Sequence, residues 1–194
     1  MFVRTERLFL RPAWPEDLDD LVEVLSEEDI HRNVGVTPLP RTTQELRAYL
    51  DRPRNPCLPH FFMYLRGADG PQLVGGVGLG RYEGDVEVGY WIGARYRGRG
   101  LAGEALRAVV AQARVLGYPR LIASDFADTP GTHQVLESAG FRDTGQVRSR
   151  YSAARAMEHA ARIYVAELQR RAAPRQTTIT PGTVAPAAIQ PAAA

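Results

Sequence analysis

Apolar residues recur at two different spacings along this chain. Short alternating or continuous apolar runs predict strands, and they cover Phe2–Arg11, His60–Arg66, Gln72–Arg81, Asp85–Ile92, Leu121–Phe126, Gln146–Tyr151 and Ala160–Leu168. Apolar residues at helical spacing predict helices that begin at Pro15, Thr42, Leu101 and Pro130. The predicted order is β-α-α-β-β-β-α-β-α-β-β, which describes an α+β domain with a mixed sheet.

The most distinctive sequence pattern in the chain lies between the predicted strand Asp85–Ile92 and the predicted helix Leu101–Leu116. Between them lies a short turn with two glycines, Gly98 and Gly100, and three arginines. Glycines let the backbone approach a ligand closely, and the first N–H groups of a helix have no partner in the chain. The pattern predicts an anion-binding turn. A plain strand–turn–helix corner with solvated arginines is the alternative.

Two phosphate-binding motifs are absent from the sequence. All 24 basic residues are arginine, so there is no P-loop lysine. The glycines do not form a dinucleotide-binding fingerprint, because Gly103 falls inside the predicted helix. Instead, Arg95-x-x-Gly98-x-Gly100 matches R/Q-x-x-G-x-G/A, the signature of the GNAT N-acetyltransferase superfamily. The run Glu87–Ile92 and the opening Thr5–Pro12 resemble its RimJ/RimL type, which acetylates protein N-termini.

This resemblance covers roughly residues 3–170 and implies the GNAT fold, a mixed, mostly antiparallel central sheet flanked by helices. It implies acetyl-CoA as cosubstrate, with its pyrophosphate held by the turn from Arg95 to Ala102 and its pantetheine arm paired with Tyr90–Gly93 like an added strand. The residues that the resemblance assigns to the cofactor are Tyr90, Trp91, Ile92, Gly93, Arg95, Arg97, Gly98, Arg99, Gly100, Leu101, Ala102 and Thr129.

A second match to the family runs from Thr129 to Phe141. The usual form is N-P-x-S-x-x-V-L-x-x-x-G-F, so Thr129 replaces an asparagine and Thr132 replaces a serine but keeps the hydroxyl. In the RimJ/RimL type this hydroxyl supports the departing thiolate, which makes Thr132 the matching residue. A hydroxyl that only caps the helix backbone is the alternative.

Acetyl transfer to an amine also needs a base, and Glu87 is the best candidate. Several GNAT enzymes carry a catalytic glutamate at this position. Glu87 alternates with Val86 and Val88 and therefore faces the other side of the sheet. An ordinary solvent-facing residue and a water-relayed base remain alternatives. Other family members use a glutamate ten residues after the Gly-Phe pair, where this chain has Tyr151, or a tyrosine where it has Leu136.

The remaining composition limits the kinds of partner, cofactor and cellular location that we expect for this protein. The formal net charge of +2 gives no support for nucleic-acid binding, and no apolar run is long enough for a membrane span. The single cysteine, Cys57, rules out an internal disulfide, and the four histidines lack metal-ligand spacing. We therefore predict a cytoplasmic protein without a metal site. Residues 1–171 form the predicted N-acetyltransferase domain, and the Ala/Pro/Thr-rich residues 172–194 form a predicted disordered tail.

These patterns predict an acetyl-CoA-dependent N-acetyltransferase whose acceptor is a protein or peptide N-terminus, attacked directly without a covalent enzyme intermediate. Small amines (antibiotics, polyamines or amino acids) are alternative acceptors. A non-catalytic acyl-CoA-binding regulator is an alternative from another class, because Thr129 and Tyr151 depart from the family pattern. The sequence leaves open whether the protein is a monomer or a homodimer.

Overall fold

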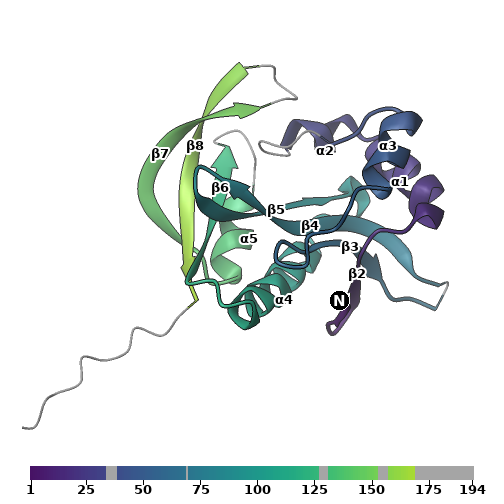
Figure 1. Cartoon of the computed structure of the whole chain (residues 1–194), viewed down its shortest axis with the longest axis horizontal. Helices are drawn as coiled ribbons and strands as arrows, with labels where there is room; N and C mark the ends of the chain where they lie inside the picture. The colour runs from purple at the N-terminus through teal and green to yellow at the C-terminus, as the bar shows by residue number, and fades with distance from the viewer. Residues whose placement is uncertain (34–38, 69, 127–130, 153–156, 169–194) are drawn as a thin grey trace, which may run out of the picture.

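The computed structural model describes residues 1–33, 39–68, 70–126, 131–152 and 157–168. Within them, eight strands form one sheet in the order β1-β2-β3-β4-β5-β6-β8-β7. The strands are β1 (Val3–Arg4), β2 (Leu8–Arg11), β3 (His60–Leu65), β4 (Gln72–Tyr82), β5 (Asp85–Ile92), β6 (Arg120–Phe126), β7 (Arg142–Ser152) and β8 (Met157–Glu167). Every neighbouring pair is antiparallel except β5 and β6. The predicted fold class is thereby confirmed (Figure 1).

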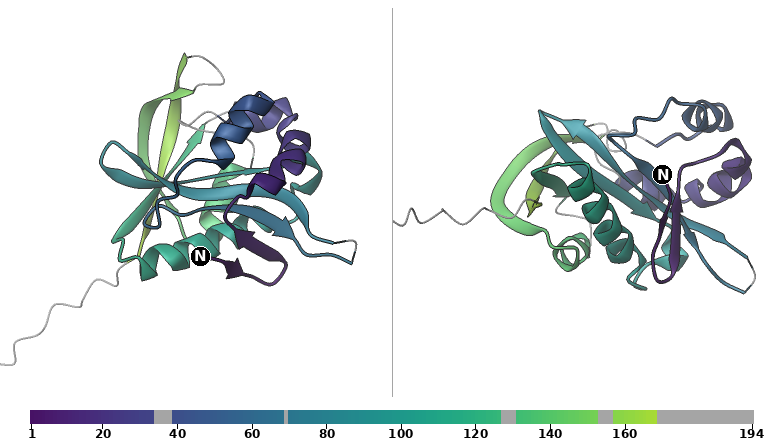
Figure 2. Two further views of the ribbon diagram at one scale, coloured as in Figure 1. Left: turned by 45° about the vertical axis from the view of Figure 1, so that its right-hand side comes forward. Right: turned by 60° about the horizontal axis from the view of Figure 1, so that its bottom comes forward.

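Helices cover both faces of this sheet. They are α1 (Leu18–Leu25), α2 (Glu28–Asn33), α3 (Thr43–Leu50), α4 (Leu101–Val115) and α5 (Thr132–Ser138). Figure 2 shows α4 and α5 on one side of the strands and α1 and α3 on the other. Two apolar clusters match these layers: Val77, Val88 and Leu106 lie in the α4 cluster, and Phe62 and Trp91 lie in the α1–α3 cluster.

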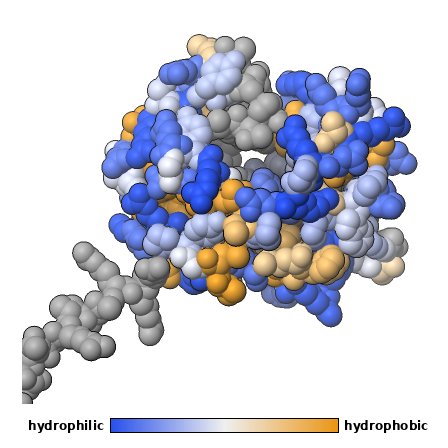
Figure 3. Space-filling model, in the orientation of Figure 1, coloured by the Kyte–Doolittle hydropathy of each residue, from blue (hydrophilic) through white to orange (hydrophobic). Residues whose placement is uncertain are grey.

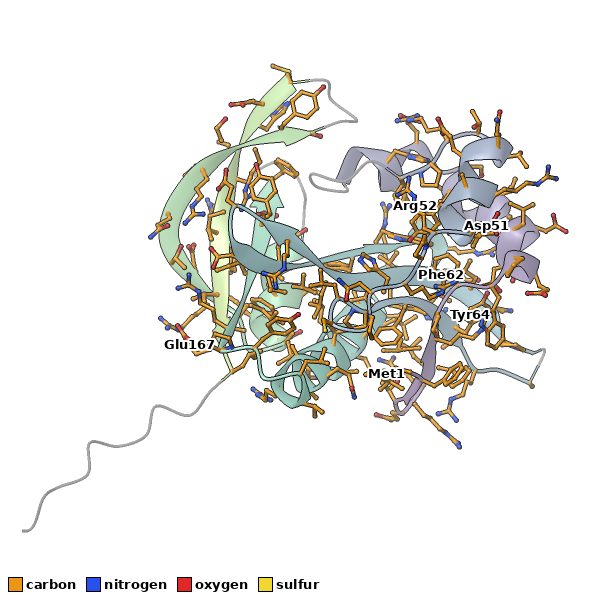
Figure 4. All side chains as sticks on the ribbon, viewed as in Figure 1. Met1, Asp51, Arg52, Phe62, Tyr64 and Glu167 are labelled. Atoms are coloured by element: carbon orange, nitrogen blue, oxygen red, sulfur yellow. The ribbon has the colours of Figure 1, made fainter. Side chains whose placement is uncertain are left out.

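The alternation along β3 explains why one strand serves both clusters. Phe61 and Met63 belong to the α4 cluster, whereas Phe62 and Tyr64 belong to the α1–α3 cluster. Figure 4 labels Phe62 and Tyr64. The same alternation puts Val86 and Val88 against α4 and leaves Glu87 on the opposite face. The predicted facing of Glu87 is therefore confirmed.

The N-terminal region differs from the prediction in two places. The first predicted strand, Phe2–Arg11, is broken after Arg4 by a turn in which the Thr5 N–H donates to the Leu8 carbonyl (3.0 Å). In addition, Glu28–Asn33 forms α2, a helix that the sequence pattern did not predict. Both elements are short, so their apolar repeats are too brief to be recognised from periodicity.

Other features follow from local sequence signals. The predicted start of α3 is confirmed, because Thr42 Oγ1 accepts from the Glu45 N–H (3.2 Å) and the Glu45 carboxylate accepts from the Thr42 N–H (3.1 Å). Among the described residues, no helix combines the length and apolar character needed to cross a membrane. The predicted tail, residues 172–194, lies outside the described residues.

Candidate active site

The two parallel strands at the centre of the sheet separate soon after they meet. Within the described residues, the register between β5 and β6 consists of one pair, Glu87 with Ile122. Beyond this pair, a cavity of about 820 Å³ extends from the N-terminus of α4, past Tyr90, to Glu87 on the other face. Figure 3 shows the molecule hollowed between the part formed by β7 and β8 and the part formed by α1–α3.

The α4 end of the cavity is built mainly from backbone. Gly98 and Gly100 have left-handed φ values of +70° and +75°, which a residue with a Cβ adopts only with strain. Gly100 is the N-cap of α4, and no described side chain caps the first turn. The free N–H groups and the helix dipole favour an anion at this point.

Four arginine side chains line the cavity: Arg7, Arg97 and Arg107, together with Arg81 from β4. Of these, the sequence analysis identified Arg97. Arg7 comes from the turn before β2, and its Nη1 donates to the carbonyl of Arg99 (2.7 Å). Arg107 lies on α4 two turns after Gly100, and this helical spacing is a signal from which it could have been predicted.

A buried acid, Glu104, fixes Arg7 at this end of the cavity. Its carboxylate accepts hydrogen bonds from the Thr5 hydroxyl (2.5 Å), the Arg7 N–H (2.8 Å) and Arg7 Nε (2.7 Å). Burial by itself would raise the pKa of Glu104, but these hydrogen bonds hold the pKa below its ordinary value. Glu104 therefore stays ionised and ties the N-terminal strands to α4.

The other two arginines of the turn lie elsewhere. Arg95 forms an ion pair with Glu23 (3.1 Å), with both side chains more than half exposed. Arg95 and Arg99 line a smaller pocket beside Tyr96. Neither they nor Gly93 lines the main cavity, whereas the other described cofactor residues from the sequence analysis do: Tyr90, Trp91, Ile92, Arg97, Gly98, Gly100, Leu101 and Ala102. Thr129 lies outside the described residues.

Tyr90 and Thr132 meet where β5 separates from β6. Both line the cavity, Tyr90 from β5 and Thr132 from the first position of α5. Burial raises the pKa of Tyr90 to about 12, a hydrogen bond with Thr132 opposes part of this shift, and the charge of Asp125 adds to it. The phenol therefore remains protonated at neutral pH and can donate a hydrogen bond.

Glu87 lies at the other end of the cavity within a polar cluster. Its Oε1 accepts a hydrogen bond from Ser124 Oγ (2.5 Å), and its Oε2 lies 3.5 Å from Nη2 of Arg150. Arg150 is 2% exposed, stacks on the ring of Tyr82 (3.7 Å), and has no hydrogen-bond partner at Nε or Nη1 among the described residues. A carboxylate at this position can bind an amine or accept a proton from it.

Within the described residues, no group of three or more His, Cys, Asp or Glu side chains could hold a metal ion. The described chemistry of the cavity includes an anion-binding helix end, a phenol–hydroxyl pair and a carboxylate, arranged in that order. Such an arrangement can hold a phosphate-bearing molecule at one end and an amine at the other.

Comparisons with known proteins agree with this geometry. A family model for the acetyltransferase (GNAT) domain matches residues 7–142, more than half of the chain. No curated protein matches the chain by sequence.

Several solved structures share the fold. An acetyltransferase of the GNAT family from Bacillus anthracis has a TM-score of 0.71 and 22% identity, covering 87% of this chain and 99% of its own. A proposed ribosomal-protein-serine acetyltransferase from Vibrio cholerae has a TM-score of 0.69 and 20% identity, covering 86% and 97%. RimL, a ribosomal L7/L12 alpha-N-protein acetyltransferase in complex with coenzyme A, has a TM-score of 0.69 and 14% identity, covering 87% and 98%.

Proposed function

The chain belongs to the GNAT acetyltransferase family and is an acetyl-CoA-dependent N-acetyltransferase, and we propose that its acceptor is the amino terminus of a protein or peptide. Two observations support this acceptor. The run Glu87–Ile92 resembles that of the RimJ/RimL type. The similar solved structures also include two described as ribosomal-protein acetyltransferases.

The residues at the α4 end suit the cosubstrate, which supplies an acetyl group activated as a thioester. The backbone from Gly98 to Ala102 presents unpaired N–H groups to a pyrophosphate, and Arg97, Arg7 and Arg107 add positive charge. The free edge of β5 beyond Glu87 offers backbone groups to an extended arm. Arg95, Arg99 and Gly93 do not line this cavity, and Thr129 is outside the described residues.

The residues at the Glu87 end suit the amine. In this proposal Glu87 binds the acceptor amine and accepts its proton, directly or through water. Backbone N–H groups of β5 polarise the carbonyl oxygen. The hydroxyl groups of Thr132 and Tyr90 lie where the thiolate departs and stabilise its charge. Transfer is direct, and no residue of the enzyme is acetylated.

For the transfer itself, the observation that carries the proposal is a single cavity that joins the N-terminus of α4 to Glu87 through the gap between β5 and β6. We would test it by incubating the protein with isotopically labelled acetyl-CoA and a panel of N-terminal peptides and small amines, with mass-spectrometric detection of the label. Transfer to peptides supports the proposed acceptor. Transfer to small amines alone would contradict it, and cofactor binding without any transfer would favour a regulatory role.

A further inference from the structure

The face of β4 that lies beside Glu87 has glycine at three alternating positions, Gly76, Gly78 and Gly80. Two of them are covered by aromatic rings. A Cβ at Gly76 would lie 2.5 Å from Trp91 Nε1, and a Cβ at Gly78 would lie 2.4 Å from His60 Nδ1. These glycines are therefore required because a ring packs directly on the backbone.

Gly80 is different, since a Cβ there would meet no atom of the described residues within 4 Å. The same holds for Gly89 on β5. The register pairs Gly78 with Gly89 and Gly80 with Glu87, so the two uncovered glycines are diagonal neighbours on one face. Both line the main cavity. They form the floor of an open bay, which we call the glycine bay, directly beside the carboxylate of Glu87.

Aromatic rings close the glycine bay along the strand direction. His60 covers Gly78 at one end, and Tyr82, two residues beyond Gly80 on the same face, lies at the other end. Gly78 and Tyr82 are four residues apart, which corresponds to about 13 Å along a strand. After the thickness of the two rings is subtracted, this length accommodates a large side chain.

The chemistry of the walls favours an apolar occupant. Burial lowers the pKa of His60, the charge of Arg54 adds to this shift, and the backbone of Leu79 opposes it, so the imidazole is neutral at neutral pH. Tyr82 presents an aromatic ring that is stacked on the buried guanidinium of Arg150, and this guanidinium is itself paired with Glu87. The floor contributes no polar side chain.

We propose that the glycine bay is the acceptor subsite for the side chain on the amine-bearing carbon, and that it selects primary amines in which this side chain is bulky and apolar or aromatic. Gly80 is the specificity-determining residue, because it leaves the space open without being required by packing. The inference rests on the proposed function, since it assumes that the acceptor amine is bound by Glu87.

Binding of bisubstrate conjugates tests the subsite without relying on turnover. Two conjugates are needed, each with coenzyme A joined through an acetyl linker to the amine of a peptide, one peptide beginning with glycine and the other with phenylalanine. The proteins compared are wild type, Gly80→Val and Gly67→Val. Valine is favourable in a strand, and Gly67 is exposed, has no left-handed φ and lies outside the cavity. Coenzyme A alone serves as the reference ligand.

We expect wild type and Gly67→Val to bind the phenylalanine conjugate at least about tenfold more tightly than the glycine conjugate. Gly80→Val should abolish this difference while leaving the affinity for coenzyme A unchanged. Equal affinity of wild type for the two conjugates, or a preserved difference in Gly80→Val, would overturn the subsite alone. If neither conjugate bound wild type more tightly than coenzyme A, the subsite and the proposed function would both be overturned.

Discussion

The cofactor side of the cavity comes largely from one continuous stretch, Gly98–Arg107, whereas the acceptor side is assembled from β3, β4 and β5. On the cofactor side, left-handed glycines and a helix N-terminus offer backbone groups to the cavity, so this part of the site depends on local conformation. On the acceptor side, His60, Gly80 and Glu87 are brought together by sheet register alone. A slip of one residue in β5 would move Glu87 to the α4 face.

We expect the largest effect from a substitution on the cofactor side, at the N-cap of α4. We predict that Gly100→Glu lowers the affinity for acetyl-CoA about 1,000-fold or more, because it places a strained side chain and a negative charge where the phosphates bind. Calorimetric titration with acetyl-CoA measures this. The matched control is Gly117→Glu, because Gly117 is also left-handed (φ +82°) but lies after the other end of α4. Equal loss of affinity in both variants would show a folding defect and contradict the account.

We expect the next largest effect from a substitution on the acceptor side. We predict that Glu87→Gln lowers kcat about 100-fold, because an amide cannot accept the amine proton, and leaves the affinity for acetyl-CoA unchanged. Steady-state kinetics together with calorimetry separate the two quantities. Glu83→Gln is the control, since Glu83 contacts Arg148 (3.6 Å) on the exposed surface. An unchanged kcat in Glu87→Gln would remove Glu87 from the proposed mechanism and favour a water-relayed base.

We expect a smaller effect from a substitution at Tyr90, where the two sides of the cavity meet. We predict that Tyr90→Phe lowers kcat roughly tenfold, because one hydrogen-bond donor beside the departing thiolate is lost. Because the pKa of Tyr90 is about 12, its ionisation should not reduce the wild-type rate across the neutral and mildly alkaline range. Single-turnover rates of wild type and Tyr90→Phe, measured from neutral to mildly alkaline pH, test both the loss of rate in the variant and the absence of a pH effect in wild type. Tyr118→Phe, which removes a phenol bonded to the Cys57 carbonyl (2.6 Å) away from the cavity, should be unaffected.

The smallest effect distinguishes arginines within the signature turn. Arg97→Gln should weaken acetyl-CoA binding about fivefold, since Arg97 lines the cavity. Arg95→Gln should change it by less than about twofold, because Arg95 forms an exposed ion pair with Glu23. Calorimetric titration of both variants under the same salt conditions makes the comparison. A larger effect for Arg95 would show that the turn rearranges when the cofactor binds.

The difference between the two sides also explains what the sequence could predict. The turn at Gly98 and Gly100, the start of α4 and the facing of Glu87 follow from local spacing, and the structure has all three. Arg7 could not be found in this way, because its position depends on Glu104, 97 residues later in the chain. The glycine bay was equally hidden, since the difference between Gly78 and Gly80 depends on where the ring of His60 lies.

The central claim is that the two sides meet at the gap between β5 and β6 and that the acetyl group crosses it directly. Intact-mass spectrometry of an equimolar mixture of enzyme and labelled acetyl-CoA, before and after addition of a peptide acceptor, tests this most directly. The Cys57→Ser variant is used because Cys57 is exposed and could react without catalysis. We predict an unmodified protein mass throughout and label on the acceptor alone. A labelled protein that passes its acetyl group to the acceptor would contradict direct transfer.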